Sequence, residues 1–318
     1  MRTRTKILFI MVVVLALVLA AGAFVGNYFF SLAINTRSDK SVVFKAGHNA
    51  LDLGENYNAK LAGYAEWFQT LDHADWRMTS HDNLDLHAYA LPGTDSGGTW
   101  VIICHGYNGH GLQMLEPAYE FHRRGYNVLL PDARGLGRSG GRYTGMGWLD
   151  RLDILDWIGE INRRHSPANI FLYGVSMGGA TVVMAAGESL PENVRAVVSD
   201  CGYSSVVDEF TYQLDKLYGL PAFPFMDCAS LVTRIRAGYW LGEASAVRQA
   251  ARSAIPILFI HGSNDAFVPV SMAEQLHDAV TAPKQKLVVD GAGHAGSAAA
   301  DPVLYWGTID SFLAKYSQ

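Results

Sequence analysis

Cysteine is scarce in this chain of 318 residues, which contains only Cys104, Cys201 and Cys228. Three widely spaced cysteines exclude the disulfide framework of a small secreted domain and a zinc site built from paired ligands. We interpret them as buried apolar thiols. A bridge between Cys201 and Cys228 stays open as an alternative if the domain faces an oxidising compartment.

Charge is also sparse, because only 17% of the residues are charged and no long run of one sign occurs. The net charge is −5, whereas a nucleic-acid-binding surface needs concentrated positive charge, so we expect no nucleic-acid partner. Hydrophobic residues make up 49% of the chain, which is enough for one large core in a single domain.

Residues 7–36 carry no charge at all, and ILFIMVVVLALVLAAGAFVG within them is an apolar stretch of 20 residues. As a helix it spans about 30 Å, the thickness of a bilayer core. It is longer than the usual apolar region of a signal peptide, although AGA at 21–23 resembles a cleavage site. We expect residues 1–30 to be an uncleaved transmembrane signal anchor, with a cleaved signal peptide and a buried core helix as the alternatives.

Three cations, Arg2, Arg4 and Lys6, precede this apolar segment, and only Arg37 and Lys40 follow it closely. By the positive-inside rule the N-terminus stays cytoplasmic, so the rest of a single-pass protein lies outside the cell membrane. If the segment is cleaved, the protein is secreted instead.

Apolar runs alternate with helical stretches from about residue 76 onward. The runs are TWVIICHG, YNVLLPD, NIFLYGV, VRAVVSD, IPILFIHG and KLVVDGAG, and DWRMTSHDNLDLHAYALP before them has the pattern of two short strands. Strands that alternate with helices predict an α/β domain at 76–318, with a mostly parallel central sheet and helices on both faces. We expect residues 31–75 to be a connecting region with a helix around AKLAGYAEWFQTL.

One connection, at about residues 202–253, is too long for an ordinary link between a strand and the next strand. It contains two amphipathic stretches interrupted by prolines, which predict a small helical cap over the sheet. The cap is rich in aromatic residues, which either line a pocket for an acyl or aryl group or pack the cap onto the sheet: Phe210, Tyr212, Tyr218, Phe223, Phe225, Tyr239 and Trp240.

Ser176 lies in the sequence GVSMG, between a predicted strand and a predicted helix. Glycines on both sides permit a sharp, strained turn that exposes the serine hydroxyl, and the start of the helix favours a developing negative charge. We therefore expect Ser176 to be a nucleophile. Ser139, in GRSGG, has the same spacing but follows a loop, so we interpret it as part of a glycine-rich turn.

A serine nucleophile needs a base to remove its proton and an acid to orient that base. Asp265 and His294 each follow a late predicted strand, in the order acid and then histidine. We expect them to complete a catalytic triad with Ser176, and we keep Asp200, which ends another strand, as the alternative acid.

The oxyanion hole of such a site consists of two backbone N–H groups. We expect them to come from Met177, directly after the nucleophile, and from Tyr107 in the loop HGYNGH. His105 and His261 each precede a glycine at a strand end, which favours hydrogen bonds to the loop. For His110, in the loop that should rim the site, contact with substrate stays open as an alternative.

The motifs HGYNG, PDARGLGRSGG, GVSMGG, HGSNDAFVP and GAGHA occur in the order and spacing of one family. With them, residues 76–316 resemble the α/β-hydrolase superfamily, and in particular bacterial membrane-anchored esterases and acylaminoacyl-peptidase-like serine hydrolases. The resemblance implies the α/β-hydrolase fold and supports the roles of Ser176, Asp265, His294, Tyr107 and Met177. It also implies that Asp132 and Arg134 brace the loops beside the site.

Three functions are compatible with these residues. The first is a serine carboxylesterase that acts on a small-molecule ester through an acyl-enzyme and needs no cofactor and no metal. The second is a peptidase or amidase of the acylaminoacyl-peptidase type. The third is a non-catalytic binding protein on a hydrolase scaffold, which the intact triad disfavours.

Overall fold

The computed structural model describes residues 2–43, 54–94, 98–166 and 169–317. These residues form one sheet of eight strands in the order β1-β2-β4-β3-β5-β6-β7-β8. The strands are β1 (Ala74–Thr79), β2 (Asp85–Leu91), β3 (Trp100–Cys104), β4 (Asn127–Pro131), β5 (Ile170–Val175), β6 (Val194–Asp200), β7 (Ile257–Gly262) and β8 (Lys284–Val289). From β4 to β8 every neighbouring pair is parallel, whereas β1 and β2 are antiparallel to their neighbours.

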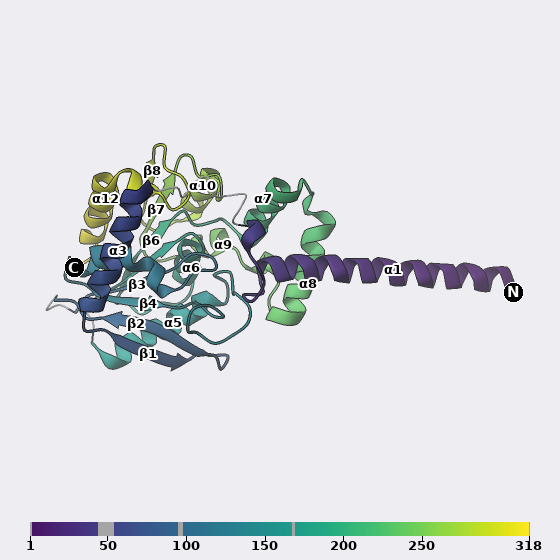
Figure 1. The fold of residues 1–318 in the computed structure, drawn as a ribbon, viewed down its shortest axis with the longest axis horizontal. Coiled ribbons are helices and arrows are strands. Elements are labelled where there is room, and N and C mark those ends of the chain that lie inside the picture. The colour runs from purple at the N-terminus through teal and green to yellow at the C-terminus, as the bar shows by residue number, and fades with distance from the viewer. Residues whose placement is uncertain (1, 44–53, 95–97, 167–168, 318) are drawn as a thin grey trace.

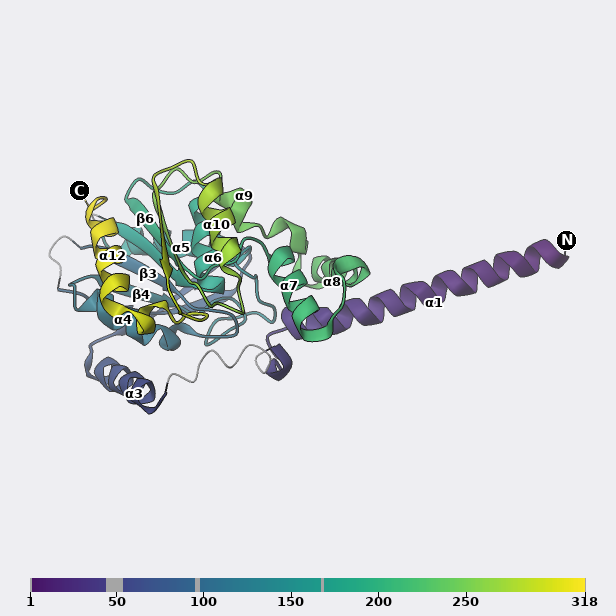
Figure 2. The same cartoon turned by 90° about the horizontal axis from the view of Figure 1, so that it is seen from above.

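Helices cover both faces of this sheet. The described residues form the helices α1 (Arg2–Ala33), α3 (Gly54–Thr70), α4 (Leu115–His122), α5 (Asp150–Arg164), α6 (Met177–Ala186), α7 (Val206–Tyr218), α8 (Ala222–Ala237), α9 (Ala246–Ala250), α10 (Val270–Ala279), α11 (Ser297–Ala300) and α12 (Pro302–Ala314). Figure 2 shows α3 and α12 on one side of the sheet and α9 and α10 on the other. The architecture is the α/β-hydrolase fold, as the sequence predicted.

The central strands are apolar along their whole length because helices pack on both of their faces. Every residue of β3 is buried, and Trp100–Cys104 pairs in register with Ile170–Gly174 of β5. Two separate hydrophobic cores result. One joins the sheet to α5, α6 and α10, and the other joins it to α3, α4 and α12. The carboxyl ends of these strands meet at one edge, where loops can gather polar groups.

The cap consists of α7 and α8, which lie beside α1 at the edge of the domain (Figure 1). The short helix α9, at the end of the expected cap at 202–253, packs instead against α6 and α10 in the main body. The expected connecting region contains α3, whose Tyr64 and Phe68 are buried in one of the two cores. This segment is therefore part of the helical layer of the domain.

The N-terminal helix α1 runs to Ala33, three residues beyond the expected end of the anchor, and its last third packs along α8. Gly26 allows this close approach, because a Cβ there would overlap the carbonyl oxygen of Cys228 on α8. The Cys228 thiol is free, as are those of Cys104 and Cys201, so the alternative disulfide does not form in this structure.

Two side chains fix the end of α1 to the domain. The Tyr107 hydroxyl donates a hydrogen bond of 2.7 Å to the carbonyl of Ala33. The Lys40 ammonium donates one of 2.6 Å to the carbonyl of Leu32, which places a cation at the negative end of the helix. Because the last carbonyls of a helix have no partner within it, these bonds define where α1 ends.

The loop after β4 is braced by buried charges. Asp132 accepts hydrogen bonds from the backbone N–H groups of Gly111 and Arg138. Arg134 is buried and donates two hydrogen bonds to Asp153 and two to Asp82. The bracing role that the resemblance implied for Asp132 and Arg134 is thus confirmed.

We predict that Arg134→Met lowers the free energy of unfolding by about 3–5 kcal/mol, because the buried carboxyl group of Asp153 then loses its guanidinium partner and the two hydrogen bonds from it. Arg123 is the matched control, since its side chain is 51% exposed and pairs with Glu120 at the surface. Arg123→Met should cost less than about 1 kcal/mol. Urea unfolding in detergent measures both variants, and equal losses would contradict the buried-charge explanation.

Candidate active site

Ser176 is the single residue between β5 and α6, and its backbone has a conformation that non-glycine residues rarely adopt. Its φ is 57° and its ψ is −120°. The turn is so tight that a Cβ on Gly174 would overlap the carbonyl oxygen of Gly178, and one on Gly178 would overlap that of Cys104. Such backbone strain persists only where the surrounding structure enforces it, and here it places the Ser176 hydroxyl at the carboxyl end of β5.

A continuous chain of hydrogen bonds joins Ser176, His294 and Asp265. The serine Oγ lies 2.9 Å from His294 Nε2, and His294 Nδ1 lies 2.8 Å from Asp265 Oδ2. The other carboxylate oxygen of Asp265 accepts hydrogen bonds from the backbone N–H groups of Phe267 (2.9 Å) and Val268 (2.8 Å). The structure therefore brings together three residues that sequence analysis selected from three distant loops.

Asp265 is held in its ionised form. Burial opposes ionisation, but hydrogen bonds from His261 and His294 outweigh it and lower the pKa of Asp265 to about 2. His261 Nε2 lies 3.2 Å from Asp265 Oδ2 and 2.8 Å from the carbonyl of Val268. His261 bonds its loop as expected, and its contact with Asp265 was not foreseen.

The side chains of the remaining polar candidates take no part in this chain of hydrogen bonds. Asp200, the alternative acid, accepts a 2.8 Å hydrogen bond from the Tyr305 hydroxyl, and burial raises its pKa to about 6. His105 bonds the carbonyl of Gly106 and accepts from a backbone N–H, as predicted for a loop histidine. His110 is exposed, and it is not among the residues that line the pocket over Ser176. The Ser139 hydroxyl donates to a backbone carbonyl within its own loop.

The two peptide groups expected in the oxyanion hole flank Ser176. Met177 is the first residue of α6, so its N–H has no partner within the helix. Tyr107 follows Gly106, and a Cβ on Gly106 would lie 3.5 Å from the Cβ of Ser176. The loop that carries Tyr107 is therefore in contact with the serine.

A largely apolar pocket of about 840 Å³, including the part that opens to solvent, lies over Ser176. Of the seven cap aromatics, Phe210, Tyr218 and Phe225 line it, and Phe223 and Trp240 are exposed. Tyr212 and Tyr239 use their hydroxyls to bond backbone carbonyls instead. Sequence analysis did not foresee that α1 also lines the pocket, with Phe29, Phe30, Leu32 and Ala33, followed by Ile34 directly after the helix.

Glu209 of α7 is a polar exception in the pocket wall. It is buried, its Oε1 accepts a 2.9 Å hydrogen bond from Gln213, and its Oε2 has no hydrogen-bond partner among the described residues. Burial raises the pKa of Glu209 to about 8, which the hydrogen bond from Gln213 opposes only partly. The carboxyl group is thus protonated at neutral pH. No motif surrounds Glu209, so sequence analysis had no signal for it.

Two clusters of side chains resemble metal sites in spacing but not in chemistry. Cys201, Asp265 and His294 offer ligand atoms within 4.8 Å of one another, yet burial strongly raises the pKa of the Cys201 thiol and opposes the thiolate that a metal needs. In the second cluster, of His81, Asp82 and Asp153, both carboxylates already pair with a guanidinium.

Two family models match the chain. Residues 98–217 match a model described as serine aminopeptidase, S33, and residues 237–315 match one described as TAP-like protein. An uncharacterized protein of Bacillus subtilis, YqkD, is 27% identical over 283 residues, which cover 89% of each chain.

Solved structures share the fold. The esterase Pf2001 of Pyrococcus furiosus has a TM-score of 0.65 at 21% identity, over 79% of this chain and 94% of that chain. The acylaminoacyl peptidase of Pyrococcus horikoshii has a TM-score of 0.58 at 16% identity, over 80% of this chain and 43% of that chain.

We predict that Glu209→Gln changes how stability depends on pH. Because the folded pKa of about 8 lies above the ordinary value of 4.5, the unfolded wild type loses this proton first as the pH rises. Wild-type stability therefore falls between about pH 5 and pH 8, by at most about 1.4 kcal/mol per unit. The Gln variant lacks this decline, so its advantage in urea unfolding should grow over that range. Parallel pH profiles would show that Glu209 ionises normally.

Proposed function

Because the chain belongs to the α/β-hydrolase superfamily, we propose that it is a serine hydrolase that cleaves carboxylic esters through an acyl-enzyme. Ser176 is the nucleophile, His294 is the general base and acid, and Asp265 orients the imidazole. The observation that carries this proposal is the unbroken hydrogen-bond chain from Asp265 through His294 to Ser176.

In the first half of the reaction, His294 Nε2 takes the proton of Ser176 as Oγ attacks the ester carbonyl carbon. The tetrahedral oxyanion accepts hydrogen bonds from the backbone N–H groups of Tyr107 and Met177, and the N-terminus of α6 supports its charge. The imidazolium then donates its proton to the leaving alcohol as the carbon–oxygen bond breaks. Water repeats these steps on the acyl-serine and releases the acid.

The low pKa of Asp265 supports this role, because a carboxylate that stays ionised accepts the Nδ1 proton of His294 and stabilises the imidazolium. Its two bonds from backbone N–H groups hold it in one orientation. The same unbroken chain disfavours a non-catalytic binding protein.

An ester is favoured by the apolar pocket beside the serine and by the fold shared with an archaeal esterase. Peptide or amide cleavage is the second candidate. The match to a model described as serine aminopeptidase and the fold shared with an acylaminoacyl peptidase favour that candidate.

The hydrolase domain, on this proposal, is held at the outer face of the cell membrane by α1, whose N-terminus is cytoplasmic. The helix from Arg4 to Ala33 is long and apolar enough to cross a bilayer. The AGA sequence at 21–23 lies inside this unbroken helix, at the point where it begins to pack on α8. An intact α1 therefore fits the fold better than a cleaved one.

Labelling with a fluorophosphonate probe tests the nucleophile. We expect Ser176→Ala to abolish labelling, because the probe forms its bond with the activated hydroxyl, and Ser139→Ala to retain it. Circular dichroism confirms that both variants are folded. Loss of labelling in the Ser139 variant alone would overturn the assignment.

A substrate panel separates the two candidate reactions. Wild type should hydrolyse p-nitrophenyl esters and leave aminoacyl and acylaminoacyl p-nitroanilides intact, since an apolar pocket has little to bind a charged amine or a peptide. The ratio of kcat/KM values is the measurement. Comparable values for esters and anilides would favour the peptidase.

A further inference from the structure

The N-terminal helix forms one wall of the pocket over Ser176. Residues 29, 30, 32 and 33 of α1 line the same cavity as the serine, together with residues of α7 and α8. At its far end, the ring of Phe29 contacts Tyr218 (5.7 Å between centroids) and Phe225 (5.9 Å) edge to face. The hydrogen bond from Tyr107 to Ala33 joins the near end of this wall to the loop beside the serine.

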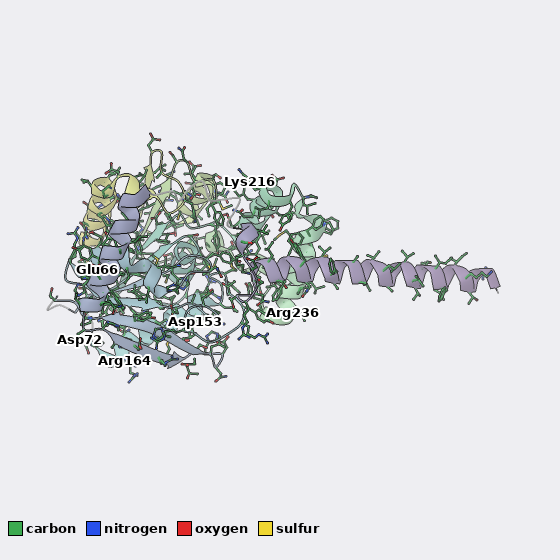
Figure 3. The ribbon with its side chains drawn as sticks, in the orientation of Figure 1. Glu66, Asp72, Asp153, Arg164, Lys216 and Arg236 are labelled. Carbon is green, nitrogen blue, oxygen red and sulfur yellow. The ribbon has the colours of Figure 1, made fainter. Side chains whose placement is uncertain are left out.

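The part of α1 up to residue 21 has no other described part of the chain packed around it. Residues 4–21 are all exposed, and their side chains project on all sides of the helix (Figure 3). The uncharged part of this segment, residues 7–21, is about 22 Å long at 1.5 Å per residue, which is shorter than a bilayer core of about 30 Å. Packing against α8 begins directly after it, at Gly22. If α1 spans the bilayer from residue 7, the bilayer core reaches the residues that pack on α8, so α8 lies at the lipid surface.

The outer face of α8 suits such a surface. Ile235 is 73% exposed, and Phe223 and Leu231 on the same helix are also exposed. Lys216 and Arg236 lie on opposite sides of α1 in the view of Figure 3, near the place where it enters the domain, as expected beside anionic head groups. These exposed apolar side chains beside a membrane-length segment favour contact with lipid, whereas Asp227 and Arg234 make the rest of the exposed surface of α8 polar.

We propose that this pocket takes the hydrocarbon chain of a membrane lipid ester, which enters from the bilayer beside α1 and α8. The inference rests on the proposed serine hydrolase function and adds its substrate class. The helix α1 then has two roles, as anchor and as pocket wall. The hydrocarbon chain of the lipid lies among the aromatic rings of α1, α7 and α8, and the ester carbonyl group of the lipid reaches Ser176.

The variant Phe29→Trp tests the pocket wall. The matched control is Phe24→Trp, because the Phe24 side chain lies on the same helix and is 75% exposed. In the detergent-solubilised full chain, the larger ring at 29 shortens the pocket. We expect the ratio of kcat/KM for decanoyl over acetyl p-nitrophenyl ester to fall about tenfold. The control should leave this ratio unchanged. Equal ratios in both variants would refute the role of α1 in the pocket.

The route of entry is tested in vesicles of phosphatidylcholine and phosphatidylglycerol that contain the protein and a fluorogenic long-chain ester. Ile235→Asp should lower turnover of this ester about tenfold relative to a soluble acetyl ester, because a carboxylate opposes contact with lipid. Val303→Asp, at an 84% exposed position on α12, is the matched control. Equal effects on both esters, or none, would refute entry from the bilayer.

Fluorophosphonate labelling of Ser176 separates the two levels of the proposal. If wild type is labelled but neither variant shifts the substrate ratios, the lipid inference fails and the serine hydrolase stands. If wild type is not labelled, the proposed function fails first.

Discussion

The close passage of β5, Ser176 and α6 past β3 is the constraint on which the site depends. Gly174 and Gly178 leave no room for a side chain, and Ser176 takes a positive φ as a result. The turn therefore holds the hydroxyl beside the Tyr107 loop and in line with His294. Because the strands on either side are buried in two cores, the fold can sustain the strain of this turn.

Three buried carboxyl groups near the site show how environment, and not residue type, determines charge. Asp265 receives two imidazole and two backbone hydrogen bonds, and its pKa is lowered. Asp200 receives one bond from a hydroxyl, and Glu209 one from an amide, so burial dominates and raises the pKa of both. Only Asp265 is suited to stabilise a positive imidazole, which agrees with its contact to His294.

The pocket over Ser176 is formed largely by segments outside the central sheet. The pocket wall combines the end of α1 with α7 and α8, and α1 is itself fixed by Tyr107 and Lys40. A helix that is long and apolar enough to cross a bilayer thus ends beside Ser176. On our proposal, attachment to a membrane and access to the pocket depend on this same helix.

From the amino-acid sequence we could predict the succession of strands and helices along the chain, the apolar N-terminal helix and the residues Ser176, Asp265 and His294. These follow from local patterns, because a strand end or a glycine turn is encoded by neighbouring residues. The folded chain was needed to show that Phe29 and Ala33 line the pocket, that Glu209 is buried in it and that His261 contacts Asp265. Each of these contacts depends on how segments distant in sequence pack together, and a local sequence pattern carries no information about that packing.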